Sequence, residues 1–400
     1  NHTWYSDTNM SIHFSANTLF DSNMVFAYWF HVLGFFEEFS DYEYNIKLIK
    51  PECLYGTTSL KKVSISDSID ILSGKNFNEI ISNPIIYCAP DTLSFNVENS
   101  NFFISTYSDN KNINSIYLQE ILLPIISKAK SKYLKQINID SLKLIFLFQN
   151  DIKFNSSTGS SSPKTIVLCL SPDDTEKVFE INLMEYFTHE LLHQRTPYHI
   201  CSSLDNNLNI FYPKNRTKHA WFTEGITEYH TFKILLDSKE ITDKDFFDAI
   251  GKKLFYLERY KRIEDSLSLT DLSKFQNDSS DYISIIYTKG AIVNFMLDIL
   301  INEKSNGKKN LNWVMNELAV KYNRDNKFEE DSLFNIITEL TYLEVGVFFE
   351  NYIENTEKLP IEEYLNKIGY RFNEINRFKF EPIKNPSLSQ KKLLNDLLLN

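Results

Sequence analysis

The sequence predicts an α+β protein of several domains, because three stretches of the 400-residue chain carry different patterns. Residues 1–112 contain short runs in which apolar and polar residues alternate, such as Tyr44–Ile49, and these are typical of antiparallel strands. Residues 113–262 combine helical and strand patterns, and residues 263–400 are mainly helical. We therefore expect a β-rich N-terminal domain, an α/β middle domain and a helical C-terminal domain with these boundaries.

The middle stretch supplies two helices and two strands. Ile113–Leu134 has apolar residues at helical spacing, and Ser141–Phe148 has the pattern of a buried strand. Asn155–Lys164 is small and polar and is predicted to be a loop. It leads into a second strand at Thr165–Leu170, and a second helix follows from Asn182.

The second helix contains the sequence His-Glu-x-x-His, which can bind a metal ion. At 3.6 residues per turn, His189 and His193 lie one turn apart on the same face. Two imidazoles so placed can hold one zinc ion, with Glu190 beside it as general base. A stripe of apolar residues gives this helix a buried face: Leu183, Phe187 and Leu191. The alternative is a core helix whose histidines bond to backbone groups.

Catalytic zinc takes a third protein ligand, and two residues compete for this place. His199 follows His193 at the spacing of the H-E-x-x-H-x-x-G-x-x-H class, but that class needs a glycine where this chain has Thr196. Glu224 is the stronger candidate, since it opens another helical segment. Glu228, one turn on, shares its face and could accept the remaining N–H of a ligand imidazole. The alternative for these two glutamates is a solvated helix face.

Charge and hydropathy exclude several other classes of protein. The net charge is -11 and there is no basic run, so we expect no binding to nucleic acid or to an anionic membrane. The longest apolar run, Met24–Phe36, has 13 residues, fewer than the ~20 of a membrane span, and is predicted to be a buried segment. The chain begins Asn-His without a methionine, from which we expect a removed signal peptide and export to the periplasm or beyond.

The four cysteines are far apart in the sequence: Cys53, Cys88, Cys169 and Cys201. They form no C-x-x-C pair, which excludes a zinc ribbon and a dithiol redox motif. We expect packed thiols. A bridge between Cys53 and Cys88 stays open, because connectivity cannot be derived from sequence.

Several motifs in order resemble one family of peptidases. Glu224 follows His193 after 30 intervening residues, within WFTEGITEY at 221–229, and this arrangement resembles the gluzincin peptidases, closest to the glycyl-aminopeptidase type. YTKGAIVNFMLDIL at 287–300 is similar to the Y-x-K-G-A segment of that family and of the aminopeptidase N group. Residues 348–365 look like the end of the family's helical region. The resemblance extends from about Glu79 to Gly369.

The resemblance implies a thermolysin-like catalytic domain with one zinc ion per chain. It implies that His189, His193 and Glu224 hold the zinc, while Glu190 activates a zinc-bound water. It also implies that Tyr287 donates a hydrogen bond to the oxyanion that forms on the substrate carbonyl. The substrate would be a peptide or protein.

The chain departs from the family where the substrate's free ammonium is bound. Family aminopeptidases use a glutamate in a glycine-rich segment before the zinc helix, and the best match here, 158–168, has Ser161 at that position. Ser160 and Ser161 are therefore predicted substrate contacts, without the carboxylate. Three carboxylates that lie nearby in sequence could substitute for it: Asp151, Asp173 and Asp174. Arg195 also stands where the family often has tryptophan.

The sequence as a whole predicts a zinc metallopeptidase, an aminopeptidase-like enzyme with altered recognition of the substrate's N-terminus. An endopeptidase on the same scaffold is the nearest alternative, because Ser161 removes the usual selection for a free amine. A weakly active binding protein that still holds zinc is the alternative from a different class.

Overall fold

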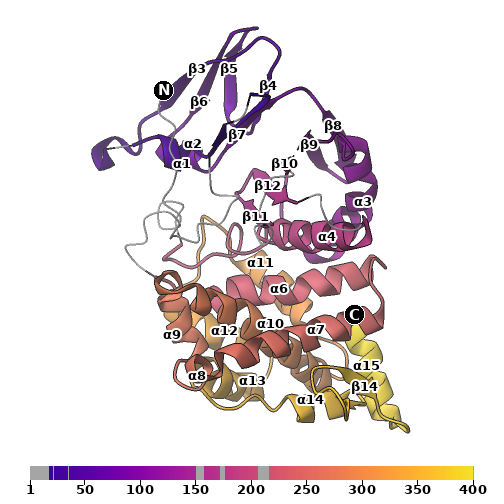
Figure 1. Ribbon diagram of the computed structural model, residues 1–400. Helices are drawn as coiled ribbons and strands as arrows, with labels where there is room; N and C mark the ends of the chain where they lie inside the picture. Colours follow the sequence, from indigo (N-terminus) through magenta and orange to yellow (C-terminus); the bar gives the residue numbers. More distant parts are fainter. Residues whose placement is uncertain are drawn as a thin grey trace. The chain divides into compact units, whose positions relative to one another are not determined.

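The computed structural model describes residues 18–20, 22–34, 36–149, 157–171, 176–205 and 216–399. They group into two compact units (Figure 1). The first unit comprises the described residues up to Leu123 and those of Ile139–Leu191. The second comprises Pro124–Asn138 and the described residues from Leu192 onward. The first unit holds the sheets and the second is mainly helical, which confirms the α+β class.

The described part of the first unit contains three sheets. A four-stranded antiparallel sheet has the order β1 (Leu19–Phe20), β2 (Met24–Ala27), β7 (Ile85–Cys88) and β4 (Tyr55–Thr58). A three-stranded antiparallel sheet has the order β3 (Tyr44–Ile49), β6 (Ile69–Gly74) and β5 (Lys61–Ile65). A five-stranded sheet has the order β11 (Thr158–Ser161), β12 (Thr165–Leu170), β10 (Ser141–Phe148), β9 (Ser100–Ser108) and β8 (Thr92–Val97). The strands predicted at 44–49, 141–148 and 165–170 are confirmed.

The five-stranded sheet is buried on both faces at β10. This strand pairs in parallel with β9 and β12, and such strands form continuous apolar runs. On one face, Leu147 packs in a cluster with Phe26 of the four-stranded sheet. On the other face, the Phe146 ring lies 6.4 Å from the ring of Phe187 in α4 (Glu176–Leu192). The sheet therefore supports the helix that carries the His-Glu-x-x-His sequence.

The helices of the first unit follow the sequence patterns with two corrections. α3 (Ser115–Lys128) continues as the π-turn η3 (Ala129–Tyr133), within the predicted helix. α4 begins at Glu176, before the predicted Asn182; its first turn includes the exposed Lys177 and Val178, so the apolar stripe from Leu183 did not indicate it. β11 lies inside the predicted loop, since pairing of its backbone with β12 needs no alternation of side chains. The unit's short helices are α1 (Trp29–Val32), η2 (Glu37–Phe39) and α2 (Phe77–Ile81).

The second unit is built around α10 (Ser280–Ser305), which packs against α6, α7, α9 and α15. Its α-helices also include α6 (Ala220–Asp237), α7 (Asp243–Leu257), α8 (Lys261–Glu264), α9 (Leu269–Lys274), α11 (Leu311–Lys321), α12 (Leu333–Leu340), α13 (Leu343–Phe349), α14 (Ile361–Lys367) and α15 (Leu388–Leu399). The shorter turns are η4 (Glu258–Tyr260), η5 (Gln276–Asp278), η6 (Glu330–Ser332) and η7 (Glu350–Glu354). A hairpin of β13 (Tyr370–Phe372) and β14 (Phe380–Pro382) precedes α15.

Within the described residues, α10 is the one helix long and apolar enough to cross a membrane. However, 83% of its most apolar window is buried inside the protein, as expected for the central helix of a globular unit. The predicted buried segment at 24–36 is confirmed in part: Met24 is fully buried, whereas Phe36 is 73% exposed. The four cysteines are free thiols, and three are packed as predicted, but Cys53 is exposed.

Candidate metal centre and active site

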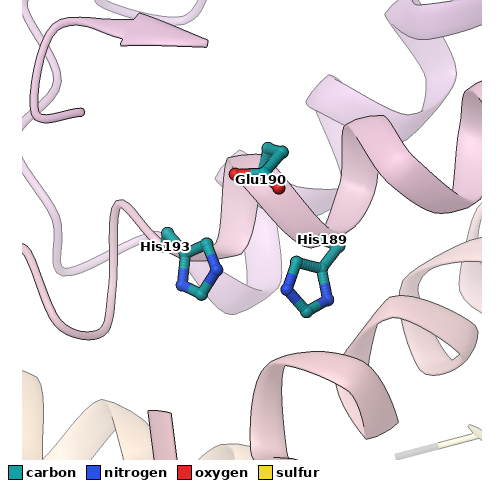
Figure 2. A group of neighbouring side chains, drawn as sticks. All are labelled: His189, Glu190 and His193. Atoms are coloured by element: carbon teal, nitrogen blue, oxygen red, sulfur yellow. The ribbon is translucent and has the colours of Figure 1, made fainter. Parts of the chain in front are cut away.

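The last turn of α4 brings together His189, Glu190 and His193. All three side chains are buried, each 7% exposed, and the atoms that they offer as ligands lie within 4.8 Å of one another. Figure 2 shows the two imidazole rings next to each other at the end of the helix, with the Glu190 carboxylate above them. The predicted helical spacing of these residues is therefore present, although the regular helix ends at Leu192, just before His193.

The hydrogen bonding of His193 fixes which ring nitrogen faces the site. Its Nδ1 lies 3.0 Å from the carbonyl oxygen of Thr196. A carbonyl only accepts, so Nδ1 carries the hydrogen and Nε2 of the neutral ring presents a lone pair. That Nε2 lies 3.4 Å from Oε2 of Glu224. A carboxylate oxygen and an imidazole lone pair repel each other unless a cation or a proton lies between them.

These donors fit a metal ion of the zinc type. Neutral imidazole nitrogen and carboxylate oxygen are zinc ligands, and a second hydrogen bond from the far side of a ligand imidazole is typical of such sites. The alternative that both histidines bond only to backbone groups does not describe His193, since one nitrogen meets Thr196 and the other meets Glu224.

Glu224 is positioned by a close crossing of α6 and α10. A Cβ atom on Gly225 would lie 2.6 Å from the Cα of Gly290, and one on Gly290 would lie 2.8 Å from the Cα of Gly225. These contacts are to backbone, so only glycine allows the two helices to approach so closely. Glu224 precedes Gly225, and Tyr287 lies about one turn before Gly290 and is half-buried. The crossing therefore sets the separation of the segments that carry Glu224 and Tyr287.

The second glutamate of α6 has a partner that the sequence did not predict. Lys253 of α7 forms an ion pair with Glu228, and both side chains are largely buried. The two residues are 25 positions apart, so no local pattern indicated the pair. A bond from Glu228 to a ligand imidazole stays a prediction.

His199, the other candidate for the third ligand, contacts a backbone carbonyl. Nε2 of His199 lies 2.9 Å from the carbonyl oxygen of Ala319. Nε2 of His199 therefore carries hydrogen and is not available to a metal. Glu224, which lies 3.4 Å from His193, stays the stronger candidate for the third ligand.

The strand β11 lies directly against Glu190. A Cβ atom on Gly159 would be 2.6 Å from Oε1 of Glu190, so glycine leaves room for the carboxylate beside the edge of the five-stranded sheet. The neighbouring Ser160 hydroxyl forms a hydrogen bond with the hydroxyl of Tyr28. Ser161 is half-buried at the end of the strand. The predicted substrate contacts Ser160 and Ser161 are thus on a strand that borders Glu190, the predicted general base.

Tyr28 is a site neighbour that sequence reasoning missed. Burial raises the pKa of its phenol, against the effect of the Ser160 hydrogen bond, and the charge of Glu190 raises it further. The hydroxyl therefore stays protonated and can donate. An aromatic residue in a buried N-terminal run carries no signal for such a contact 132 positions away. The three predicted substitutes for the missing carboxylate, Asp151, Asp173 and Asp174, lie outside the described residues.

The fold is similar to those of several solved structures. The structure is similar to an aminopeptidase N family protein from Idiomarina loihiensis, with a TM-score of 0.75 and 18% identity over 88% of this chain and 62% of that one. It is also similar to an M1 zinc metallopeptidase from Deinococcus radiodurans, with a TM-score of 0.56 and 10% identity over 86% of this chain and 73% of that one. A mutant of the Deinococcus enzyme bound to a Tyr-Ser-Ala substrate gives a TM-score of 0.56 and 10% identity, over 89% of this chain and 74% of that one.

A family model matches part of the sequence. Residues 182–293 match the model of the M61 glycyl aminopeptidase family. None of the curated proteins matches the chain. The resemblance to the glycyl-aminopeptidase type is therefore confirmed for the segment that holds the His-Glu-x-x-His helix, Glu224 and Tyr287. The chain spans about three fifths of the length of the Idiomarina protein.

Proposed function

We propose that the protein is a zinc metallopeptidase in which His189, His193 and Glu224 hold one zinc ion per chain. The observation that carries the proposal is the meeting of His193 Nε2 with the Glu224 carboxylate at 3.4 Å, beside His189 and Glu190. The hydrogen bond of His193 to Thr196 orients the ring for this role. When bound, zinc supplies Lewis-acid chemistry, which polarises the substrate carbonyl and lowers the pKa of water.

The residues of the chain itself supply proton transfer and charge stabilisation. Glu190 takes a proton from the attacking water and delivers it to the leaving amine. Gly159 keeps the space beside the Glu190 carboxylate open. Tyr287, on the helix that crosses α6 at Gly290, donates a hydrogen bond to the oxygen on which charge develops.

An extended peptide is the substrate that the edge strand favours. Among the described residues, β11 is the last strand in the order of the five-stranded sheet, and a peptide bound alongside it would follow the mode of an added strand. Gly159 lies against Glu190 on this strand, which would bring a peptide paired there next to the catalytic base. Ser160 and Ser161 follow on the same strand as substrate contacts.

Two positions of cleavage are compatible with this arrangement. An aminopeptidase needs a counter-ion for the substrate ammonium, and at β11 the chain offers the neutral hydroxyls of Ser160, Ser161 and Tyr28. This favours either an aminopeptidase with altered N-terminal recognition or an endopeptidase. Cleavage of matched peptides with free and N-acetylated termini separates the two. Equal kcat/KM values indicate an endopeptidase, and a loss of ~10-fold or more on acetylation indicates recognition of the amine.

Substitution of Glu190 by glutamine tests the proposed mechanism. We expect kcat to fall by at least about 10³-fold, because the amide cannot accept the water proton, while zinc content stays near one per chain. Peptide hydrolysis and metal analysis of the same preparation provide the measurement. Glu344→Gln, which alters an exposed ion pair with Lys304, is the matched control and should be fully active.

The same experiment addresses a binding protein that holds zinc but cleaves weakly. Hydrolysis by the wild-type protein that disappears on removal of zinc and returns on its addition supports the enzyme. Activity that persists in Glu190→Gln contradicts the assignment of the base.

A further inference from the structure

Arg195 is a buried cation two residues beyond His193. Its side chain is 0% exposed. Nη1 donates to Oδ1 of Asn312 in α11 at 3.1 Å, and Nη2 lies 2.6 Å from Nδ1 of His230 in α6. Nε has no hydrogen-bond partner among the described residues. The guanidinium thus links the turn after α4 to two helices of the second unit.

This arrangement is costly for stability. The guanidinium is fully buried, and none of the ion pairs between described residues includes it. Burying a charge against neutral partners is unfavourable, and apolar side chains of similar volume often stabilise such positions better. What the guanidinium adds is a planar fork with fixed directions for its hydrogen bonds.

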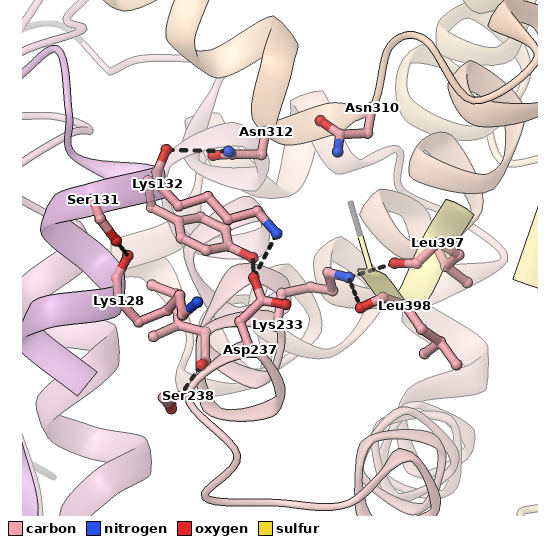
Figure 3. Close-up of polar contacts among 12 residues, drawn as sticks. Lys128, Ser131, Lys132, Lys233, Asp237, Ser238, Asn310, Asn312, Leu397 and Leu398 are labelled. Atoms are coloured by element: carbon pink, nitrogen blue, oxygen red, sulfur yellow. Dashed lines mark hydrogen bonds and ion pairs between the residues drawn. The ribbon is translucent and has the colours of Figure 1, made fainter. Parts of the chain in front are cut away.

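Both partners of the fork are themselves fixed. Burial and the charge of Arg195 hold the pKa of His230 far below its usual range, so the ring is neutral and its Nδ1 accepts. The ring packs against Tyr133, with centroids 5.4 Å apart, and Tyr133 donates to Asp237 at 2.7 Å. Figure 3 shows Asp237 with the Lys132 ammonium, and the bond from the Asn312 amide to the backbone oxygen of Lys132.

The residue after Arg195 makes the connection to the metal centre. Thr196 supplies the carbonyl oxygen that accepts from Nδ1 of His193, and Nε2 of that ring faces Glu224. Glu224 lies on α6, six positions before His230. A closed loop of contacts therefore runs from His193 through Thr196 and Arg195 to α6, and back to His193 through Glu224.

We propose that Arg195 is a positioning residue: by clamping its backbone to His230 and Asn312, it holds the Thr196 carbonyl where it orients His193 toward Glu224. The inference rests on the proposed zinc site. It assigns a role to the side chain that stands where the glycyl-aminopeptidase type often has tryptophan.

Substitution of Arg195 by methionine tests the role through zinc affinity, measured by competition with a chelator on folded protein. Loss of a group that orients a ligand typically weakens metal binding about 10- to 100-fold, and we expect about 10-fold because Arg195 acts through Thr196. We expect kcat to fall by a similar factor while KM changes less than about 2-fold, since Arg195 does not contact the proposed peptide site. In the zinc-free protein, the Nδ1 proton of His193 should exchange faster in ¹⁵N-edited spectra.

Lys233→Met is the matched control. Like Arg195, Lys233 is a buried cation. It lies on α6, and its ammonium donates to the carbonyl oxygens of Leu397 and Leu398 at the end of α15 (Figure 3). We expect this variant to unfold at a lower temperature with unchanged zinc affinity. If Arg195→Met unfolds early but binds zinc as tightly as the wild type, the residue is only structural and the proposal is wrong.

Two further variants keep the test decisive if Arg195→Met does not fold. Arg195→Lys retains the charge without the fork, and we expect it to fold with an intermediate zinc affinity. Arg195→Met combined with His230→Phe removes both hydrogen-bonding groups at once, and should restore stability without restoring zinc affinity. Restored affinity in the double variant would contradict positioning. A wild-type protein that takes up no zinc would instead contradict the proposed function itself.

Discussion

The two halves of α6 use similar polar residues in opposite ways. In the first half, the Glu224 carboxylate faces an imidazole nitrogen that already carries its hydrogen on the far side of the ring. In the second half, Asp237 accepts hydrogen bonds from both Lys132 and Tyr133 at 2.7 Å. The Glu224 carboxylate thus faces a nitrogen that carries a lone pair in the neutral ring, whereas the Asp237 carboxylate faces two donors.

The difference shows how a buried polar group indicates function. A carboxylate surrounded by donors is a finished structural network, and it needs nothing further to be stable. A carboxylate oxygen and the lone pair of a neutral imidazole, held 3.4 Å apart, are unfavourable neighbours unless a cation or a proton lies between them. The Glu224 end of α6 therefore has a place for a cation, whereas the hydrogen bonds of Asp237 are already made within the protein.

Removal of the carboxylate in the first half should have the largest effect. We expect Glu224→Ala to weaken zinc binding by more than about 100-fold, because that factor already applies to residues that merely orient a ligand. Peptide hydrolysis at limiting zinc should disappear with it. Chelator competition measures the affinity, and Glu344→Ala, at an exposed position paired with Lys304, serves as the control. If Glu224→Ala binds zinc as tightly as the wild type, Glu224 is not a zinc ligand. The proposed difference between the Glu224 and Asp237 carboxylates would then be wrong.

The proposed oxyanion donor on α10 gives the next largest effect. We expect Tyr287→Phe to lower kcat about 10²- to 10³-fold with zinc affinity unchanged, because one hydrogen bond to the developing charge is lost. Tyr282→Phe alters a half-buried phenol earlier on the same helix and should have no effect on kcat. If kcat of Tyr287→Phe is normal, Tyr287 does not stabilise the oxyanion. The proposed zinc site at Glu224 would not be affected by this result.

A substitution at the crossing of α6 and α10 should have a smaller effect. In Gly290→Ala the new methyl group would meet the Gly225 backbone at 2.8 Å, so the helices must separate. We expect a loss of about 1–3 kcal/mol of unfolding free energy, partly offset by the better helix propensity of alanine, and a decrease in kcat. Denaturant titration measures the stability. Gly34→Ala is the control, since no atom lies within 4 Å of the added Cβ, and its stability should be nearly unchanged.

Much of the fold and the metal centre could be predicted from local patterns. Strands such as Ser141–Phe148 are apolar because they are buried on both faces, and the His-Glu-x-x-His spacing follows from the pitch of one helix. Glu224 was predicted from a motif 30 residues away, and the structure brings its carboxylate to His193.

What could not be predicted depends on contacts between distant residues. β11 consists of small polar residues and becomes a strand through its backbone pairing with β12. The bond between Tyr28 and Ser160, and the ion pair of Glu228 with Lys253, join segments that have no common sequence pattern. The sequence shows of Arg195 only that it stands where the glycyl-aminopeptidase type often has tryptophan. Its role could be inferred only when His230 and Asn312 were seen beside it.

The smallest expected effect concerns Asp205, a carboxylate outside α6. Burial raises the pKa of Asp205 to about 6, despite a hydrogen bond from the Ser202 backbone, and the charge of Glu330 raises it further. Because the folded protein then binds this proton more tightly than the unfolded chain, the group lowers stability as pH rises from about 4 to above 6.

Asp205→Asn keeps an acceptor for Ser202 without the charge. We expect it to increase the unfolding free energy at pH 7.5 by about 1 kcal/mol, and by much less at pH 4.5. Thermal unfolding of both proteins at the two pH values measures the difference. An equal effect at both pH values would show that packing, rather than an uncompensated buried charge, sets the cost at this position.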